Sequence, residues 1–146
     1  NGAVARHRGG GTVAAVCRDH RGAYLGSSSV AFPGVLDPVT LETYACREVL
    51  ALAEDLNLQK FVIASDCQEV INDINRGTGG PHAAIVHEII GRQSSFQFSS
   101  FIHERRNHNF EAYKLAKFAC NLDRGRHVWL GIPHNPTIVP MNIAVE

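Results

Sequence analysis

The chain of 146 residues has no net charge, no long apolar run and no closely spaced pair of cysteines. Its 14 Lys+Arg residues balance 14 Asp+Glu residues, which argues against a generic basic nucleic-acid binder. No stretch approaches the roughly 18–20 apolar residues of a membrane-spanning helix, so we expect no membrane association. A hydrophobic share of 45% is typical of a globular protein, and the length suits one compact domain.

The four cysteines are Cys17, Cys46, Cys67 and Cys120. They form no CxxC motif, and each lies in or beside an apolar stretch, which is typical of buried free thiols. The spacing indicates neither a zinc site nor a disulfide framework. Because the sequence also opens without a charged and then apolar leader, we expect an intracellular protein, nuclear or cytoplasmic.

The neutral total hides an uneven distribution of charge. Residues 31–70 are acidic, whereas residues 1–30 and 101–130 are basic. Ordinary scatter of surface charge explains this pattern about as well as a functional arrangement does. The neutral total therefore does not by itself exclude nucleic acid.

Hydrophobic periodicity and turn residues predict a mixed α/β domain of residues 1–127. Strands are expected over residues 12–17, 23–29, 61–64 and 96–104, after a first strand that is only implied, and helices over residues 38–57, 67–76, 81–92 and 109–122. Asp37 followed by Pro38 is a typical start for the first helix. From Val128 the chain shows neither helical nor strand period, which predicts an extended tail over residues 128–146, lying on the domain or awaiting a partner.

Two acidic residues stand out by position. Asp66 follows the apolar strand at residues 61–64 at its carboxyl end, where open α/β sheets bind ligands. Glu42 lies on the flank of the apolar face of the first helix, where a carboxylate is partly desolvated or turned toward another charge. Such acids suit hydrolysis by two metal ions, because Mg²⁺ prefers oxygen ligands. The alternatives are that Asp66 caps the second helix and that Glu42 lies in a first helical turn.

Five motifs follow one another along the chain: Asn1-Gly2-Ala3, Cys17-Arg18-Asp19-(x2)-Gly22, Glu42-(x2)-Ala45-(x4)-Leu50, Ile63-Ala64-Ser65-Asp66, and His103-(x2)-Arg106-(x2)-Asn109-(x2)-Ala112-(x2)-Leu115-Ala116. Val128-Trp129 and Pro133 follow them in the tail. Together they resemble the ribonuclease H-like domain of the reverse-transcriptase-like type that is abundant in plant genomes. The resemblance implies a ribonuclease H-like mixed five-stranded sheet flanked by helices, in a retrotransposon-derived plant protein. It also implies a first strand that runs before Asn1, so the chain is expected to begin near the end of that strand.

In that family an Asp-Glu-Asp trio, often with a fourth acidic or His position, binds two Mg²⁺ ions and the enzyme hydrolyses the RNA strand of an RNA–DNA hybrid. The resemblance carries Glu42 and Asp66 over as ligands of Mg²⁺ or Mn²⁺. Asn1 stands where the first Asp belongs, and Tyr113 stands where Asp or His is usual. Neither contributes a negative charge at neutral pH, so we expect weakened metal binding. Asn1 is either an engineered replacement or a natural change, and Tyr113 slightly favours the natural one.

Three residues before the last helix, Arg105, Arg106 and Asn109, are candidates for nucleic-acid contact, because positive charge and helix N-termini favour phosphate. Plain solvation and capping are the alternative. The sequence thus supports two functions. One is a nucleic-acid-binding hybrid endoribonuclease, weakened or inactive. The other is a catalytically dead module for protein–protein interaction within a larger plant protein.

Overall fold

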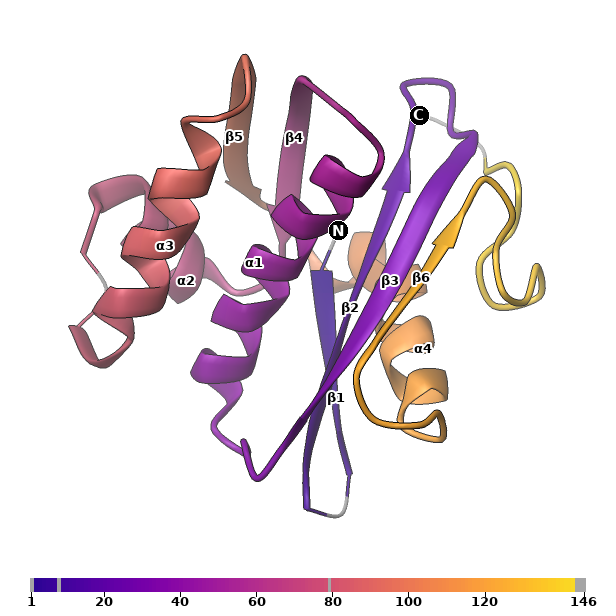
Figure 1. Cartoon of the computed structure of the whole chain (residues 1–146), viewed down its shortest axis with the longest axis horizontal. Helices are drawn as coiled ribbons and strands as arrows, with labels where there is room; N and C mark the ends of the chain where they lie inside the picture. Colours follow the sequence, from indigo (N-terminus) through magenta and orange to yellow (C-terminus); the bar gives the residue numbers. More distant parts are fainter. Residues whose placement is uncertain (1, 8, 79, 144–146) are drawn as a thin grey trace.

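The computed structural model describes residues 2–7 (backbone only), 9–78 and 80–143, which form six strands and four α-helices (Figure 1). The strands are β1 (Gly2–His7), β2 (Gly10–Arg18), β3 (Tyr24–Pro33), β4 (Lys60–Ser65), β5 (Phe98–His103) and β6 (Arg126–Leu130). The helices are α1 (Pro38–Asp55), α2 (Gln68–Arg76), α3 (Ala83–Gln93) and α4 (Phe110–Ala119). This order confirms the predicted α/β class.

The strands pair in two groups. An antiparallel sheet has the order β1-β2-β3-β6, and β4 pairs with β5 in parallel. Strand β1 lies beside β4, so the two groups are neighbours in the fold (Figure 1). The five expected strands are all present, and β6 adds a sixth.

Helices α1 and α4 cover opposite faces of the antiparallel sheet (Figure 1). Because side chains alternate along a strand, Val13 of β2 packs with Leu41 of α1, and Ala14 packs with Leu115 of α4. A Cβ on Gly11 would lie 2.4 Å from the Leu41 side chain, so a larger residue there would force Leu41 of α1 to shift. Burial on both faces explains why β2 reads as a nearly continuous apolar run.

A second core lies between α1, α2, α3 and the β4–β5 pair. It contains Leu50, Ile63, Ile71, Ile89 and Phe101, each at most 4% exposed. This packing holds the carboxyl ends of β4 and β5 against the N-terminal half of α1, which is where the candidate site lies.

The prediction of a tail without a strand from Val128 is wrong, because β6 pairs with β3 from Gly26↔Leu130 to Val30↔Arg126. The strand has five residues, and several prolines follow it in the sequence. It therefore forms by pairing with β3 and not through a residue pattern of its own. Beyond it the chain lies on the domain, as one of the two alternatives expected. Val139 is 2% exposed in the α4 core, and the Tyr24 N–H donates to the Met141 carbonyl at 2.8 Å.

The expectation that the chain begins near the end of its first strand also needs correction. Strand β1 runs from Gly2 to His7 and pairs with β2 along that whole length. Short side chains such as Ala3 and Ala5 give this segment little strand signal, and pairing with β2 determines it. Within the described residues, no helix is long and apolar enough to cross a membrane.

Candidate functional site

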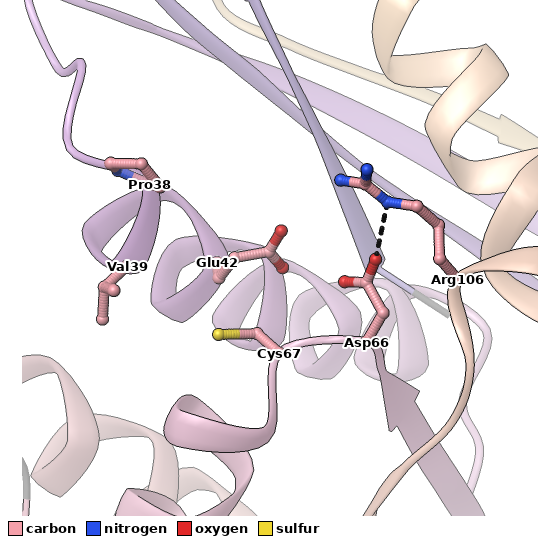
Figure 2. A pocket seen from close by; sticks show the side chains of 6 residues that line it. All are labelled: Pro38, Val39, Glu42, Asp66, Cys67 and Arg106. Atoms are coloured by element: carbon pink, nitrogen blue, oxygen red, sulfur yellow. Dashed lines mark hydrogen bonds and ion pairs between the residues drawn. The ribbon is translucent and has the colours of Figure 1, made fainter.

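A pocket of about 380 Å³ lies where α1, the end of β4 and the loop after β5 meet. It is lined by Pro38, Val39, Glu42, Asp66, Cys67 and Arg106 (Figure 2). The structure therefore brings together Glu42 and Asp66, which are 24 residues apart in sequence, with Arg106, one of the cationic candidates. Glu42 and Asp66 point toward one another, and the Arg106 guanidinium lies over Asp66, joined to it by an ion pair (Figure 2).

Helix α1 begins as the sequence predicts. The Asp37 carboxylate accepts the Thr40 N–H at 2.8 Å, and Pro38 occupies the first turn. Glu42 consequently lies in the second turn rather than the first, and the first turn has no acidic residue. A favourable interaction with the helix N-terminus therefore does not explain Glu42.

Asp66 does not cap α2 with its side chain. Cys67 is the N-cap residue, and its N–H donates to the Ser65 hydroxyl at 3.2 Å. The Asp66 carboxylate instead accepts a hydrogen bond from Arg106 Nε at 3.2 Å. The capping alternative fails, and the Asp66 side chain lies in the pocket.

The Glu42 carboxyl is desolvated and incompletely satisfied. Its Oε2 atom is buried and has no hydrogen-bond partner. The pKa of Glu42 is raised to about 8, mainly by burial and also by the negative charge of Asp66, while the positive charge of Arg106 opposes the shift. Glu42 is therefore mostly protonated at neutral pH, and a cation placed between the two carboxyl groups would favour its ionised form.

Arg106 connects Asp66 with Tyr113. Its guanidinium carbon lies 5.9 Å from the centre of the Tyr113 ring, a cation–π distance, while Nε contacts Asp66. The Arg106 side chain is 81% exposed, so its guanidinium contacts Asp66 at the pocket and remains accessible to solvent. Tyr113 lies on α4 and is 36% exposed. Its ring contacts Arg106, which in turn contacts Asp66 in the pocket.

Sequence reasoning missed Glu104, which lies beside Asp66. The first residue after β4 is Asp66 and the first after β5 is Glu104, and the Glu104 N–H donates to the Ser65 carbonyl at 2.9 Å. Its Oε1 atom is buried without a hydrogen-bond partner, and burial is the main cause that raises the pKa of Glu104, with Asp66 adding to it. The signal was available: two parallel strands that end together place the residues that follow them side by side.

The remaining candidates do not line this pocket or lie outside the described residues. Arg105 is exposed at the start of a 3₁₀ turn, Arg106–Asn109. Asn109 occupies the N-cap position of α4 but makes no side-chain capping bond, and it is 2% exposed. Asn1 lies outside the described residues.

The donor set fits one hard divalent cation. Glu42 offers a buried oxygen without a partner, and Asp66 has a second oxygen on the side of Glu42 (Figure 2). Mg²⁺ is often held by one or two carboxylates with water completing its shell. The described part of the chain holds no group of three or more His, Cys, Asp or Glu side chains placed for a metal, so the fit rests on the carboxyl groups of Glu42 and Asp66 alone.

Residues 1–119 match the family model described as reverse transcriptase-like. Ribonuclease H1 from the halophilic archaeon Halobacterium salinarum superposes with a TM-score of 0.63 at 17% identity, covering 80% of this chain and 89% of that one. The N-terminal ribonuclease H domain of a Mycobacterium tuberculosis protein, solved as a fusion with maltose-binding protein, gives a TM-score of 0.69 at 18% identity, covering 82% and 88%. No curated protein matches the chain.

The family match spans most of the chain, and the two solved structures show the fold, since identities this low support nothing finer. The chain belongs to the reverse transcriptase-like family and has a ribonuclease H-like fold.

Proposed function

We propose that this domain binds nucleic acid and cleaves the RNA strand of RNA–DNA hybrids weakly, with Mg²⁺ or Mn²⁺ held by Glu42 and Asp66. One observation carries the proposal: a buried Glu42 oxygen without a partner faces Asp66 in an open pocket. A buried carboxyl oxygen left unsatisfied costs free energy, and a bound cation would remove that cost.

The chain's own residues have separate tasks in this reaction. A bound Mg²⁺ would supply a Lewis acid and lower the pKa of a coordinated water. Glu42 and Asp66 would hold the cation, and Glu42 would be ionised in that state. Arg106, which lines the pocket, and the exposed Arg105 next to it in sequence contact phosphate oxygens and place the RNA strand over the carboxylates. We expect recognition of hybrid shape and of the 2′-hydroxyl, with little base preference.

Cleavage of a labelled RNA–DNA hybrid in Mg²⁺ and in Mn²⁺ tests the proposal. Asp66→Asn should reduce the cleavage rate at least tenfold, because it removes a ligand charge. Glu69→Gln is the matched control, since it removes a carboxylate three residues away on α2, outside the pocket. Asn1→Asp should raise the rate if Asn1 stands at a ligand position. If Asp66→Asn cleaves as fast as Glu69→Gln, the site assignment is wrong.

The second candidate function is a catalytically dead module for protein–protein interaction in a larger plant protein. Exposed apolar side chains around the end of β6 favour it: Leu130 is 52% exposed, Ile132 73% and Met141 43%. Absence of cleavage in every variant, Asn1→Asp included, together with hybrid binding that does not weaken steeply with salt, would favour this second function. A nuclear or cytoplasmic location and a retrotransposon-derived origin in plants accompany both proposals as predictions.

A further inference from the structure

The Arg106 guanidinium contacts two side chains at once, which an ordinary surface ion pair does not require. Its Nε atom lies 3.2 Å from Asp66 Oδ2, and its guanidinium lies over the Tyr113 ring at 5.9 Å. Asp66, which follows β4, and Tyr113 of α4 therefore both contact the Arg106 side chain, although that side chain is 81% exposed. An exposed ion pair contributes at most about 1 kcal/mol to stability, so stability is a weak reason for this arrangement.

The two oxygens of Asp66 face different groups. One accepts the hydrogen bond from Arg106, and the other lies on the side of Glu42 (Figure 2). The Asp66 oxygen on the side of Glu42 is placed to bind a divalent cation. The other oxygen already contacts the positive charge of Arg106. A cation on the side of Arg106 would meet the guanidinium, and Tyr113 beyond it offers an aromatic ring and a phenol in place of a carboxylate.

We propose that this site holds a single divalent cation and that Arg106, positioned by Tyr113, supplies the positive charge that a second cation supplies in a two-metal site. The inference rests on the proposed function, since that charge would act on the phosphate being cleaved. A guanidinium suits this task because it is always charged and presents several donors to phosphate oxygens. The arginine needs only Nε for Asp66, which leaves its terminal nitrogens for the substrate.

Tyr113 is a positioning residue in this arrangement. Its ring face is the part that attracts the guanidinium, and its hydroxyl has no assigned task. In the family pattern an acid or a histidine occupies this position and serves as a ligand. In this chain Tyr113 would instead hold Arg106 in place. The consequence is that the aromatic ring, rather than the phenol oxygen, should be required.

Binding of Mn²⁺ to the free protein, followed by paramagnetic resonance and titration calorimetry, tests the proposal without substrate. The parent chain should bind one Mn²⁺. Arg106→Gln should bind one Mn²⁺ about tenfold more tightly, because a nearby positive charge is gone. Arg105→Gln removes the same charge at a residue without a contact to Asp66 and should change the affinity by less than about twofold.

Tyr113 variants separate the ring from the hydroxyl. Tyr113→Phe should keep the Mn²⁺ affinity of the parent, whereas Tyr113→Leu should shift it toward that of Arg106→Gln. The double variant Arg106→Gln/Tyr113→Asp should take up a second Mn²⁺, because a third carboxylate replaces the arginine. In hybrid cleavage, Arg106→Gln should lose at least tenfold in kcat despite its tighter cation, which a purely structural role would not produce.

Two Mn²⁺ ions on the parent chain, or no Mn²⁺ on either the parent or Arg106→Gln, would overturn the single-cation site. Equal Mn²⁺ affinities of Arg106→Gln and Arg105→Gln would overturn the role of Arg106. Failure of all variants to cleave hybrid would instead overturn the proposed function. The Mn²⁺ measurements are made without substrate, so the two failures can be told apart.

Discussion

Two arginines show how differently this fold treats charge in two regions. Arg18, at the end of β2, has a side chain 10% exposed, and its guanidinium donates to Glu111, to the Gly22 carbonyl and, at 2.6 Å, to the Pro140 carbonyl. Arg106 is 81% exposed and donates one hydrogen bond, to Asp66. We call the first region, Arg18 with Glu111 and residues 138–143, the tail clamp, and the second the pocket.

The difference lies in how completely the polar groups are satisfied. In the tail clamp, Arg18 finds several acceptors from three parts of the chain. In the pocket, Glu42 and Glu104 each keep a buried oxygen without a partner. Satisfied groups stabilise a fold and unsatisfied ones destabilise it. The clamp therefore serves stability, whereas the pocket retains a cost that a ligand could remove.

The largest expected effect is the pH dependence that Glu42 confers. Its pKa is about 8 in the folded protein against 4.5 ordinarily, so the folded state holds the proton more tightly than the unfolded state. This stabilisation is complete below pH 4.5 and is lost as the pH rises through 8. The loss amounts to as much as about 4 kcal/mol.

Urea unfolding without divalent cations between pH 5 and pH 9 measures this loss. Glu42→Gln should flatten the decline, because an amide does not titrate in this range. Glu69→Gln serves again as the control and should keep the parent's slope. Equal slopes in the parent and Glu42→Gln would show that Glu42 is not the group responsible.

The tail clamp should respond to loss of Arg18. Arg18→Gln leaves the Glu111 carboxylate and the Pro140 carbonyl without their charged donor, and we expect a loss of about 3 kcal/mol in the free energy of unfolding. Urea unfolding at pH 7 measures it. A loss below about 1 kcal/mol would mean that the clamp is no more important for stability than a surface ion pair.

A smaller effect is expected from the apolar part of the same region. Val139→Ala removes two methyl groups from a side chain that is 2% exposed in the α4 core, which should cost about 2 kcal/mol. Ile132→Ala is the matched control, since that side chain is 73% exposed. Equal unfolding midpoints for the two variants would contradict the docking of the tail on the domain.

The smallest effect on stability should come from Arg106. Arg106→Gln breaks one exposed contact with Asp66, so the free energy of unfolding should change by less than about 0.5 kcal/mol. Comparison with Arg18→Gln in the same unfolding series shows whether the two arginines differ as proposed. If Arg106→Gln lowered the free energy of unfolding as much as Arg18→Gln, the two arginines would not differ in their contribution to stability.

Local patterns predicted much of the fold and part of the site. The Asp37 cap, the start of α1 at Pro38 and the placement of Asp66 after β4 all came from neighbouring residues. The position of Glu42 on the flank of the apolar helix face singled it out, the resemblance paired it with Asp66 as a metal ligand, and the pocket brings the two together. Strands β1 and β6 were misjudged because neither has a strong pattern of its own, and each is formed by pairing with its neighbour.

The sequence by itself determined the α/β class, the start of α1 and the strand end that carries Asp66, because capping, periodicity and apolar runs act within a few residues. The tertiary structure alone decided that Arg106 contacts Asp66 across 40 positions and that Arg18 contacts Glu111 across 93. Those outcomes depend on which strands pair and which helices cover them. No local signal contains that information, because it is set by the packing of the whole domain.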